Sequence, residues 1–175
     1  MKKIGFYLLF IALFSNFSVL KRIDILIEKE IKSVFNIETY TKKTIQISEE
    51  VKEELSVKFT DNNFFEIFDD SNNKLGYYYF GKAFGKAAYF DFIVVFDKDL
   101  VVSKIKILAY REDHGGEIAS KRWLRQFIGS EKDKTLKYKK DIAAISGATL
   151  SALSLTTEVN KLLKSVGVLY NKKLI

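Results

Sequence analysis

Between residues 64 and 108 the hydrophobic residues lie in short segments that follow the period of two typical of β-strands, most clearly in the last segment. The strands predicted from this pattern span residues 64–68, 75–80, 88–96 and 100–108. Asp, Ser and Asn fill the turn at 69–74, so the first two strands are expected to form a hairpin. In the last strand Ile105 and Ile107 alternate with lysines. One dry face and one wet face indicate an antiparallel sheet.

Helical spacing of the hydrophobic residues occurs in three other segments. The first is amphipathic and spans 23–35. The second is a short helix that begins near Ser120 and ends at Gly129 as a C-cap. The third begins at Thr149 and is expected to end at Gly167. The residues predicted on one side of the short helix are Trp123, Leu124, Phe127 and Ile128.

Two shorter elements are predicted before the hairpin. Residues 44–47 alternate like a strand, and Ser48 suits the N-cap of a helix over 49–55. Together the elements predict an α+β fold, a single domain with a mostly antiparallel sheet flanked by helices. Hydrophobic residues make up 47% of the 175 residues, enough for a core, and no repeat or linker marks a second domain. We divide this domain into an N-terminal helical and hairpin part, 21–74, and a core, 75–168.

The first twenty residues have the pattern of an export segment. Lys2 and Lys3 precede an apolar run over 4–14, and Lys21 and Arg22 close the segment. The pattern fits a signal peptide, although no Ala-x-Ala cleavage site follows, and its length is near the lower limit of a membrane span. Residues 1–20 are therefore predicted to be a signal peptide or an N-terminal membrane anchor. Either places the domain on the non-cytoplasmic side, at the cell membrane or in the periplasm.

Composition excludes several classes of chemistry. The chain has no Cys, which excludes disulfides, thiolate nucleophiles and iron–sulfur clusters, and its single His excludes a His-based metal cluster. No Gly-x-Ser-x-Gly elbow is present, so we assign no catalytic residue and no metal site. The net charge of +7 is spread along the chain rather than gathered in one stripe, so no nucleic-acid partner is expected.

Small residues and hydroxyls stand directly before the long C-terminal helix. The start of a helix exposes unpaired N–H groups and the positive end of the macrodipole, which suit a phosphate. Plain helix capping is the alternative interpretation, since no Walker loop or dinucleotide glycine pattern is present. The candidate cofactor-binding residues here are Ser146, Gly147, Ala148, Thr149, Leu150 and Ser151.

A second candidate segment follows the last predicted strand. His114 lies among acids in a loop, where a lone His is commonly a surface residue. The two glycines after it allow the backbone to approach a flat ligand closely. Trp123 suits either core packing of the short helix or stacking on an aromatic cofactor. The candidate residues of this segment are His114, Gly115, Gly116, Glu117 and Trp123.

From residue 76 to residue 164 the sequence resembles the FMN-binding domain family, whose best-known members are flavin-carrying components of the sodium-translocating NADH:quinone reductase and of the related Rnf complex. The matching features are, in order, a Gly-led strand pair at 84–108, a Gly-containing loop at 112–116, a short helix at 123–129 and Ser-Gly-Ala-Thr at 146–149. In that family the final Thr of this motif carries FMN through a phosphoester bond, which a dedicated flavin transferase installs from FAD. The resemblance therefore implies covalent FMN on Thr149.

The sequence departs from the family pattern in two places. The acid that usually precedes the motif is replaced by Ala143, with Asp141 two positions earlier. Recognition by the transferase is therefore expected to be weaker or to use Asp141. The loop at 112–117 also lacks the Thr-Pro and the Leu of the family's Glu-Thr-Pro-Gly-Leu-Gly, so its flavin contacts need not follow the family's.

These observations predict an exported or membrane-tethered flavoprotein that acts in electron transfer rather than as a stand-alone enzyme. The flavin supplies the redox chemistry, and the protein attaches and orients it. Without a nicotinamide fingerprint, electrons are expected to pass to and from redox protein partners in or at the membrane. The alternative is a non-redox, membrane-associated binding or accessory module of the same fold without flavin.

Overall fold

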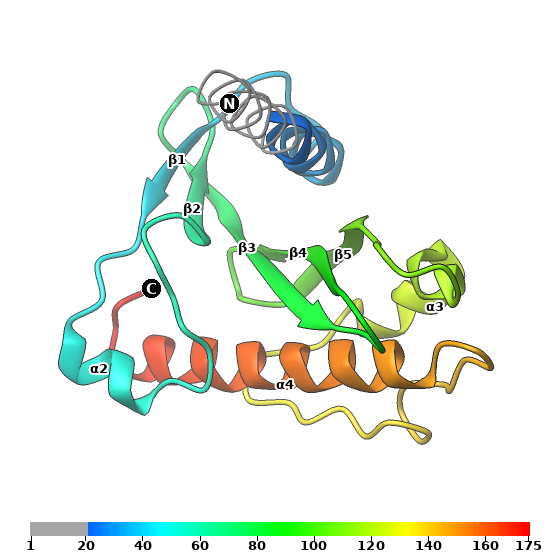
Figure 1. Ribbon diagram of the computed structural model, residues 1–175. Coiled ribbons are helices and arrows are strands. Elements are labelled where there is room, and N and C mark those ends of the chain that lie inside the picture. Colours follow the sequence, from blue (N-terminus) through cyan, green and yellow to red (C-terminus); the bar gives the residue numbers. More distant parts are fainter. Residues whose placement is uncertain (1–20) are drawn as a thin grey trace, which may run out of the picture.

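The computed structural model describes residues 21–175 (Figure 1). The predicted signal peptide or anchor at 1–20 lies outside the described residues. Within the described part, no helix is both long enough and apolar enough to cross a membrane.

One five-stranded sheet organises the fold. Its strands follow one another in space as they do in the chain, and every neighbouring pair is antiparallel. The prediction of a single α+β domain with an antiparallel sheet is thus confirmed. The sheet continues from 21–74 into 75–168, because β2 pairs with β3. The strands are β1 (Thr41–Thr44), β2 (Phe64–Phe68), β3 (Lys74–Phe84), β4 (Tyr89–Asp97) and β5 (Val102–Ala109).

Each face of the sheet is covered by a helix (Figure 1). Helix α4 (Thr149–Asn171) packs on one face, where it meets Phe92, Val94 and other alternate residues of the strands. The helix over 21–35 packs on the opposite face against Ile93, Val95 and their neighbours. Successive residues of β4 therefore enter two different cores, which is why its central residues are all apolar.

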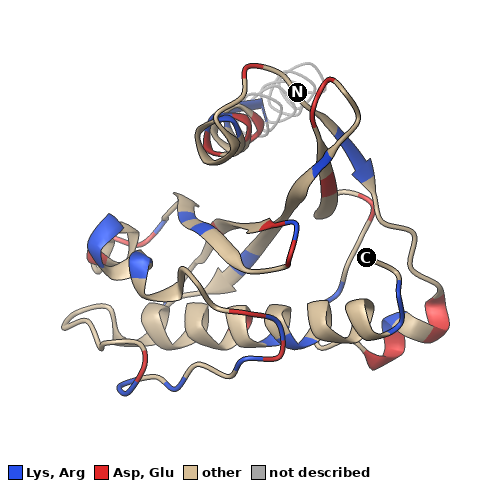
Figure 2. Cartoon of the chain, turned by 180° about the vertical axis from the view of Figure 1, so that it is seen from behind, with Lys and Arg blue, Asp and Glu red and all other residues tan. Residues whose placement is uncertain are grey.

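Helix α4 is longer than predicted. It begins at Thr149, as expected, but it continues through Gly167 to Asn171, so the prediction that Gly167 ends it is wrong. Gly167 is buried, and a Cβ there would collide with the carboxylate of Asp133. The glycine therefore allows a connecting loop to approach the helix closely. Figure 2 shows that most of α4 carries no charged residue, as expected of a helix that packs on the face of a sheet.

The first strand lies earlier than predicted. Residues 41–44 pair with β2, whereas Ile45 and Ile47, the basis of the predicted strand at 44–47, pack outside the sheet onto the α4 side. The ammonium groups of Lys42 and Lys43 lie over the rings of Phe65 and Phe68, at 4.5 and 4.0 Å from the ring centroids. Such contacts let lysines occupy an exposed edge strand.

The two shorter helical predictions had different outcomes. Helix α2 (Glu49–Glu54) begins after Ser48, whose hydroxyl accepts the N–H of Val51, as predicted. The single helix expected after Ser120 is instead two short pieces, α3 (Lys121–Leu124) and η2 (Arg125–Phe127), and a third piece, η1 (Gly116–Ala119), precedes Ser120. Ile128 is exposed, whereas Trp123, Leu124 and Phe127 are buried. Gly129 follows them with a positive φ of 81°, as a C-cap glycine does.

A buried carboxylate connects the helix over 21–35 to the sheet. Glu30 is 4% exposed and bonds to Lys106 and, at 3.1 Å, to Lys104 of β5. Burial alone would raise the pKa of Glu30, but the hydrogen bonds from Lys106 and Lys104 bring it below the ordinary value of 4.5. The ionised carboxylate therefore stabilises the fold.

Replacing Glu30 with Gln should lower the free energy of unfolding by about 1–3 kcal/mol at neutral pH, because two charged hydrogen bonds are weakened at a buried site. The folded-state pKa is lowered, so this stabilisation is complete above the unfolded pKa and is lost as the pH falls through the folded value. Urea unfolding of both proteins from neutral pH down to acid should show the difference shrinking. Glu158→Gln, which removes a surface pair with Lys161, should change stability by less than about 1 kcal/mol.

Candidate functional site

Thr149 is the first residue of α4, and its side chain is exposed. Its hydroxyl has one long hydrogen bond, 3.4 Å to the carbonyl oxygen of Ile145. The N-cap residue is Ala148, which has no side-chain oxygen to cap the helix, and the first turn contains no acid. The free N–H groups at this end are thus offered to an external anion. An accessible hydroxyl stands beside them.

Gly147 gives the turn before α4 its shape. Its φ is +80°, a conformation that favours glycine, and a Cβ placed on it would meet open space. Ser146 and Gly147 are exposed, whereas Ala148 is buried. No residue from 142 to 157 is charged, and this end of α4 and the loop before it are uncoloured in Figure 2. The positive potential of the helix terminus is therefore not neutralised by its own segment.

The loop after β5 packs directly on this turn. A Cβ added to Gly115, whose φ is +84°, would lie 2.9 Å from the Cβ of Ala148 and 2.9 Å from the hydroxyl of Tyr110. That hydroxyl lies 3.1 Å from the carbonyl oxygen of His114, to which it donates, and 3.0 Å from Oγ of Ser151. The structure thus brings together three of the candidate residues, Gly115, Ala148 and Ser151.

The turn between β3 and β4 completes this side of the site. One carboxylate oxygen of Glu112 accepts the N–H groups of Ala87 and Ala88, at 2.8 and 3.0 Å. These bonds lower the pKa of Glu112 below its ordinary value, so the carboxylate stays ionised. A Cβ on Gly85 would contact both Glu112 and Ser151. The β3–β4 turn therefore touches the first turn of α4, where Figure 1 shows the end of β3 meeting the start of that helix.

The segment that leads to Ser146 is held by two side chains of the short helices. The indole N–H of Trp123 donates to the carbonyl oxygen of Ala143 at 2.7 Å. The amide of Gln126 accepts the N–H of Ala143 at 2.8 Å and donates to the carbonyl oxygen of Trp123 at 2.9 Å. Trp123 is only 6% exposed and packs edge-to-face on Phe127. Its polar atom thus fixes the backbone of the segment at 143–146.

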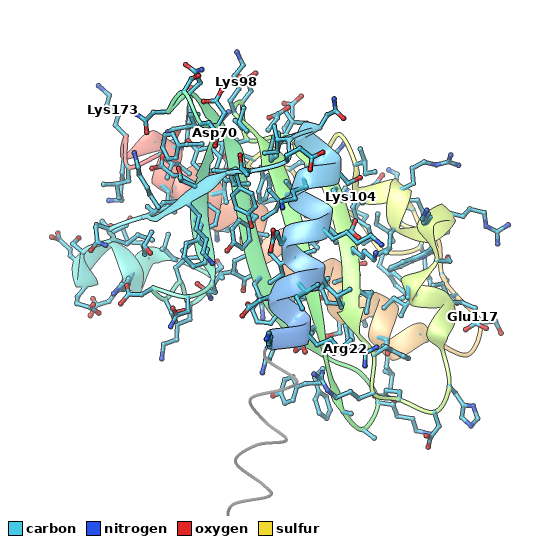
Figure 3. All side chains as sticks on the ribbon, turned by 90° about the horizontal axis from the view of Figure 1, so that it is seen from above. Arg22, Asp70, Lys98, Lys104, Glu117 and Lys173 are labelled. Atoms are coloured by element: carbon cyan, nitrogen blue, oxygen red, sulfur yellow. The ribbon has the colours of Figure 1, made fainter. Side chains whose placement is uncertain are left out.

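A groove of about 510 Å³ lies between the short helices and this segment. Its size is within the range of about 300–1,000 Å³ that small-molecule sites occupy. Figure 3 shows Glu117 on the short helices at the outer edge of the fold. The lining residues are Glu117, Ser120, Arg122, Trp123, Gln126, Ala143, Ala144, Ile145 and Ser146.

A larger pocket, of about 660 Å³, lies elsewhere, beside α2. Residues 49–61 supply its lining, and none of the candidate residues is among them. Figure 1 shows α2 near the C-terminal end of α4, away from Thr149. We therefore place the candidate site at the smaller groove, where residues 143–146 form one wall.

The predicted residues fall into three groups. Ser146, Glu117 and Trp123 line the groove, and Gly115 packs on the turn that leads to Thr149. Leu150 is 53% exposed on the first turn of α4. Gly116 is also exposed, and a Cβ added to it would meet nothing within 4 Å. His114 is exposed, and within residues 21–175 its imidazole has no hydrogen-bond partner.

Several residues of the site were not predicted. Tyr110, Glu112, Gly85 and Gln126 connect the loops around Thr149 through the contacts described above. No local pattern pairs residue 112 with residue 87, because such pairing depends on the register of the sheet. Asp141, the proposed substitute for the missing acid, accepts the N–H of Lys137 at 2.8 Å and so stabilises its own turn.

Replacing Gly115 with Ala should destabilise the protein more than replacing Gly129 with Ala. Both glycines have φ near +80°, so both substitutions carry a backbone cost of about 1–2 kcal/mol. A Cβ on Gly129 meets nothing within 4 Å, whereas one on Gly115 meets Ala148 and Tyr110. We expect a further loss of about 1–3 kcal/mol for Gly115→Ala in urea unfolding. Equal losses for the two variants would show that the loop does not pack on the turn at 147–148.

Comparison with known families finds a match over the part of the chain that contains this site. Residues 85–164 match the FMN-binding domain family. The matched range begins at Gly85, next to the β3–β4 turn, and includes the loop after β5, the short helices, the groove and most of α4. A search of curated proteins finds no match to the chain. The protein is therefore a flavin-binding protein with an FMN-binding domain at residues 85–164.

Proposed function

We propose that the protein carries FMN covalently, through a phosphoester bond to the hydroxyl of Thr149, and acts as an exported or membrane-tethered electron-transfer protein. The observation that carries this proposal is the position of Thr149. Its exposed hydroxyl stands on the first residue of a helix that has no side-chain cap and no acid in its first turn, within an FMN-binding domain.

Attachment needs no catalytic group from this chain. The hydroxyl oxygen of Thr149 forms a bond to the phosphorus of the FMN half of FAD, the bond between the two phosphates breaks, and AMP leaves. The hydroxyl proton passes to a base of the flavin transferase. The chain contributes an accessible nucleophile and helix N–H groups that stabilise the phosphate charge in the product.

The groove of about 510 Å³ beside the motif is the place that we propose for the ring system of the cofactor. Bound FMN would supply the redox chemistry of the site. Ser146 connects the attachment turn to the groove, and Arg122 and Glu117 place opposite charges at its edge. His114 is expected to lie near the ring, on the loop that packs against Ala148. Redox protein partners in or at the membrane would supply and remove the electrons.

One observation favours the alternative of an accessory module without flavin. The position that holds an acid in the family pattern is Ala143, and Asp141 is already bonded to the N–H of Lys137. If the transferase needs that acid, the site would stay unmodified. The two functions differ in whether Thr149 is esterified, which is measured directly.

Replacing Thr149 with Val should abolish covalent flavin, because the substitution removes the only atom that the proposed ester uses. The full chain is produced with a flavin transferase in an export-competent host, denatured, and examined by in-gel fluorescence and intact mass. The native protein should fluoresce and carry the mass of FMN less one water. Thr157→Val is the matched control, since Thr157 is also exposed on α4, two turns along, with its hydroxyl bonded to Leu153. A dark native band, or equal fluorescence in Thr149→Val, would contradict the proposal.

Replacing Trp123 with Phe should lower the fraction of protein that is flavinylated when the transferase is limiting. The ring packing on Phe127 is kept, but the hydrogen bond to Ala143 is lost, so the attachment segment is less well positioned. The cost in stability should be about 1 kcal/mol. Asn160→Leu is the control, because Asn160 bonds both the N–H and the carbonyl of Leu136, away from the motif. It should destabilise the protein without lowering flavinylation; an equal drop in both variants would assign the effect to stability alone.

A further inference from the structure

Two exposed aromatic residues lie at the tip of the β3–β4 hairpin. Phe84 and Tyr89 are cross-strand partners with ring centroids 4.9 Å apart, and they are 46% and 59% exposed. By the two-residue alternation of a strand, Phe84 is on the same face as Phe80, which packs in the core under the helix over 21–35. The aromatic pair, Phe84 and Tyr89, thus continues that face beyond the part the helix covers.

The position of the helix over 21–35 along the strands explains why the helix does not cover the aromatic pair. Phe35 lies against Gly76, near one end of β3. Glu30 bonds to Lys104 and Lys106 of β5. Through their partners in β4, these two lysines are level with Tyr78 and Phe80 of β3. From residue 35 back to residue 21 the helix spans about 21 Å, or about six strand residues. Its first residues are therefore level with Lys82, just before the aromatic pair. In Figure 3, Arg22 lies at this end of the sheet and Lys98 at the other.

The surroundings of the aromatic pair are basic. Lys82 and Lys86, on either side of Phe84, are exposed, as are Lys21 and Arg22 at the start of the helix. Two acids lie at this turn: Asp91, which is buried and bonded to Arg111, and Glu112, whose carboxylate is bonded to the N–H groups of Ala87 and Ala88. Aromatic rings with a rim of cations match the interface of an anionic membrane, where rings settle at the headgroup level and lysines meet the phosphates.

The sequence of residues 1–20 indicates that the surface near the aromatic pair is a membrane. Residues 1–20 join the described structure at Lys21, at this end of the sheet, and their sequence contains the apolar run at 4–14. A segment of that composition, inserted in a membrane, would bring the start of the helix over 21–35 to the lipid surface. The hairpin tip ends at the same level.

We propose that the aromatic pair docks into the anionic lipid surface to which the chain is tethered and holds the Thr149 end of α4 at the membrane interface. Gly85, next to Phe84, touches Ser151 on the first turn of α4, so docking fixes the attachment site as well as the hairpin. The proposal rests on the membrane tethering in the proposed function, and it is independent of whether flavin is attached. It places the site where membrane-bound redox partners meet it.

Environment-sensitive labels on the full chain test this proposal. The chain has no Cys, so Ala87→Cys and Lys98→Cys each give one labelling site, at the hairpin tip and at the opposite end of the sheet. The labelled chains are reconstituted in phosphatidylcholine vesicles with and without phosphatidylglycerol, some with lipid-borne quenchers. The label at 87 should shift to the blue and be quenched, more strongly with anionic lipid, while the label at 98 stays in water. Equal quenching at both sites, or none at 87, overturns the proposal.

A second set of variants separates docking from tethering. In the Ala87→Cys chain, changing Phe84 and Tyr89 to Ser should abolish most of the quenching while the chain still floats with the vesicles. Tyr170→Ser, at an equally exposed aromatic residue near the C-terminus, should leave it unchanged. Unchanged quenching in the double variant would overturn docking by the aromatic pair. A native chain that does not float overturns docking and tethering together, and in-gel fluorescence of the same samples reports flavin attachment separately.

If the label at 87 stays in water although the chain floats and is flavinylated, tethering and flavin attachment stand and docking fails. The aromatic pair would then be assigned to contact with a protein partner. If the label is quenched in a chain without flavin, docking stands and the flavin proposal fails.

Discussion

Burial of β4 on both of its faces determines most of this fold. Its residues from Phe90 to Phe96 are all buried, alternately toward α4 and toward the helix over 21–35. Each large apolar side chain removed from water there contributes about 1.5–3 kcal/mol, and neither face is stable without a cover. The two helices are therefore required on opposite sides of the sheet. Because each helix packs on one face of the sheet, the position of each helix end relative to the strand ends is also fixed.

The site is a consequence of where α4 begins. Because the helix packs along the sheet, its first turn arrives at the β3–β4 turn, and Gly85 and Gly115 are the residues that allow the two loops to close on it. Tyr110 joins the loop to Ser151, while Trp123 and Gln126 hold the incoming segment. These polar groups of the loops thus hydrogen-bond to one another. The N–H groups at the start of α4 and the hydroxyl of Thr149 face outward.

Sequence periodicity was sufficient for the parts of the fold that bury one face in a regular way. It located four strands, the helix after residue 21 and the start of α4 at Thr149, since these signals are local. It failed at β1, because the alternation at Ile45 and Ile47 reflects packing outside the sheet. It also failed at Gly167, which allows close contact with Asp133 and does not end the helix. Pairs such as Glu112 with Ala87 depend on strand register, which no local window contains. The motif at 146–149 was found because its residues are contiguous.

An open site and a covalent bond suit one another in the proposed flavoprotein. Most of the residues that line the groove, including Ser120, Ala144 and Ser146, are exposed, so the groove encloses little of a ligand. A cofactor held only by such a surface would dissociate readily outside the cell membrane, where free FMN is scarce. A phosphoester to Thr149 would prevent that loss without closing the site. The ring of the proposed flavoprotein would then stay open to a partner protein, as an electron carrier requires, and the start of α4 would fix the position from which it extends.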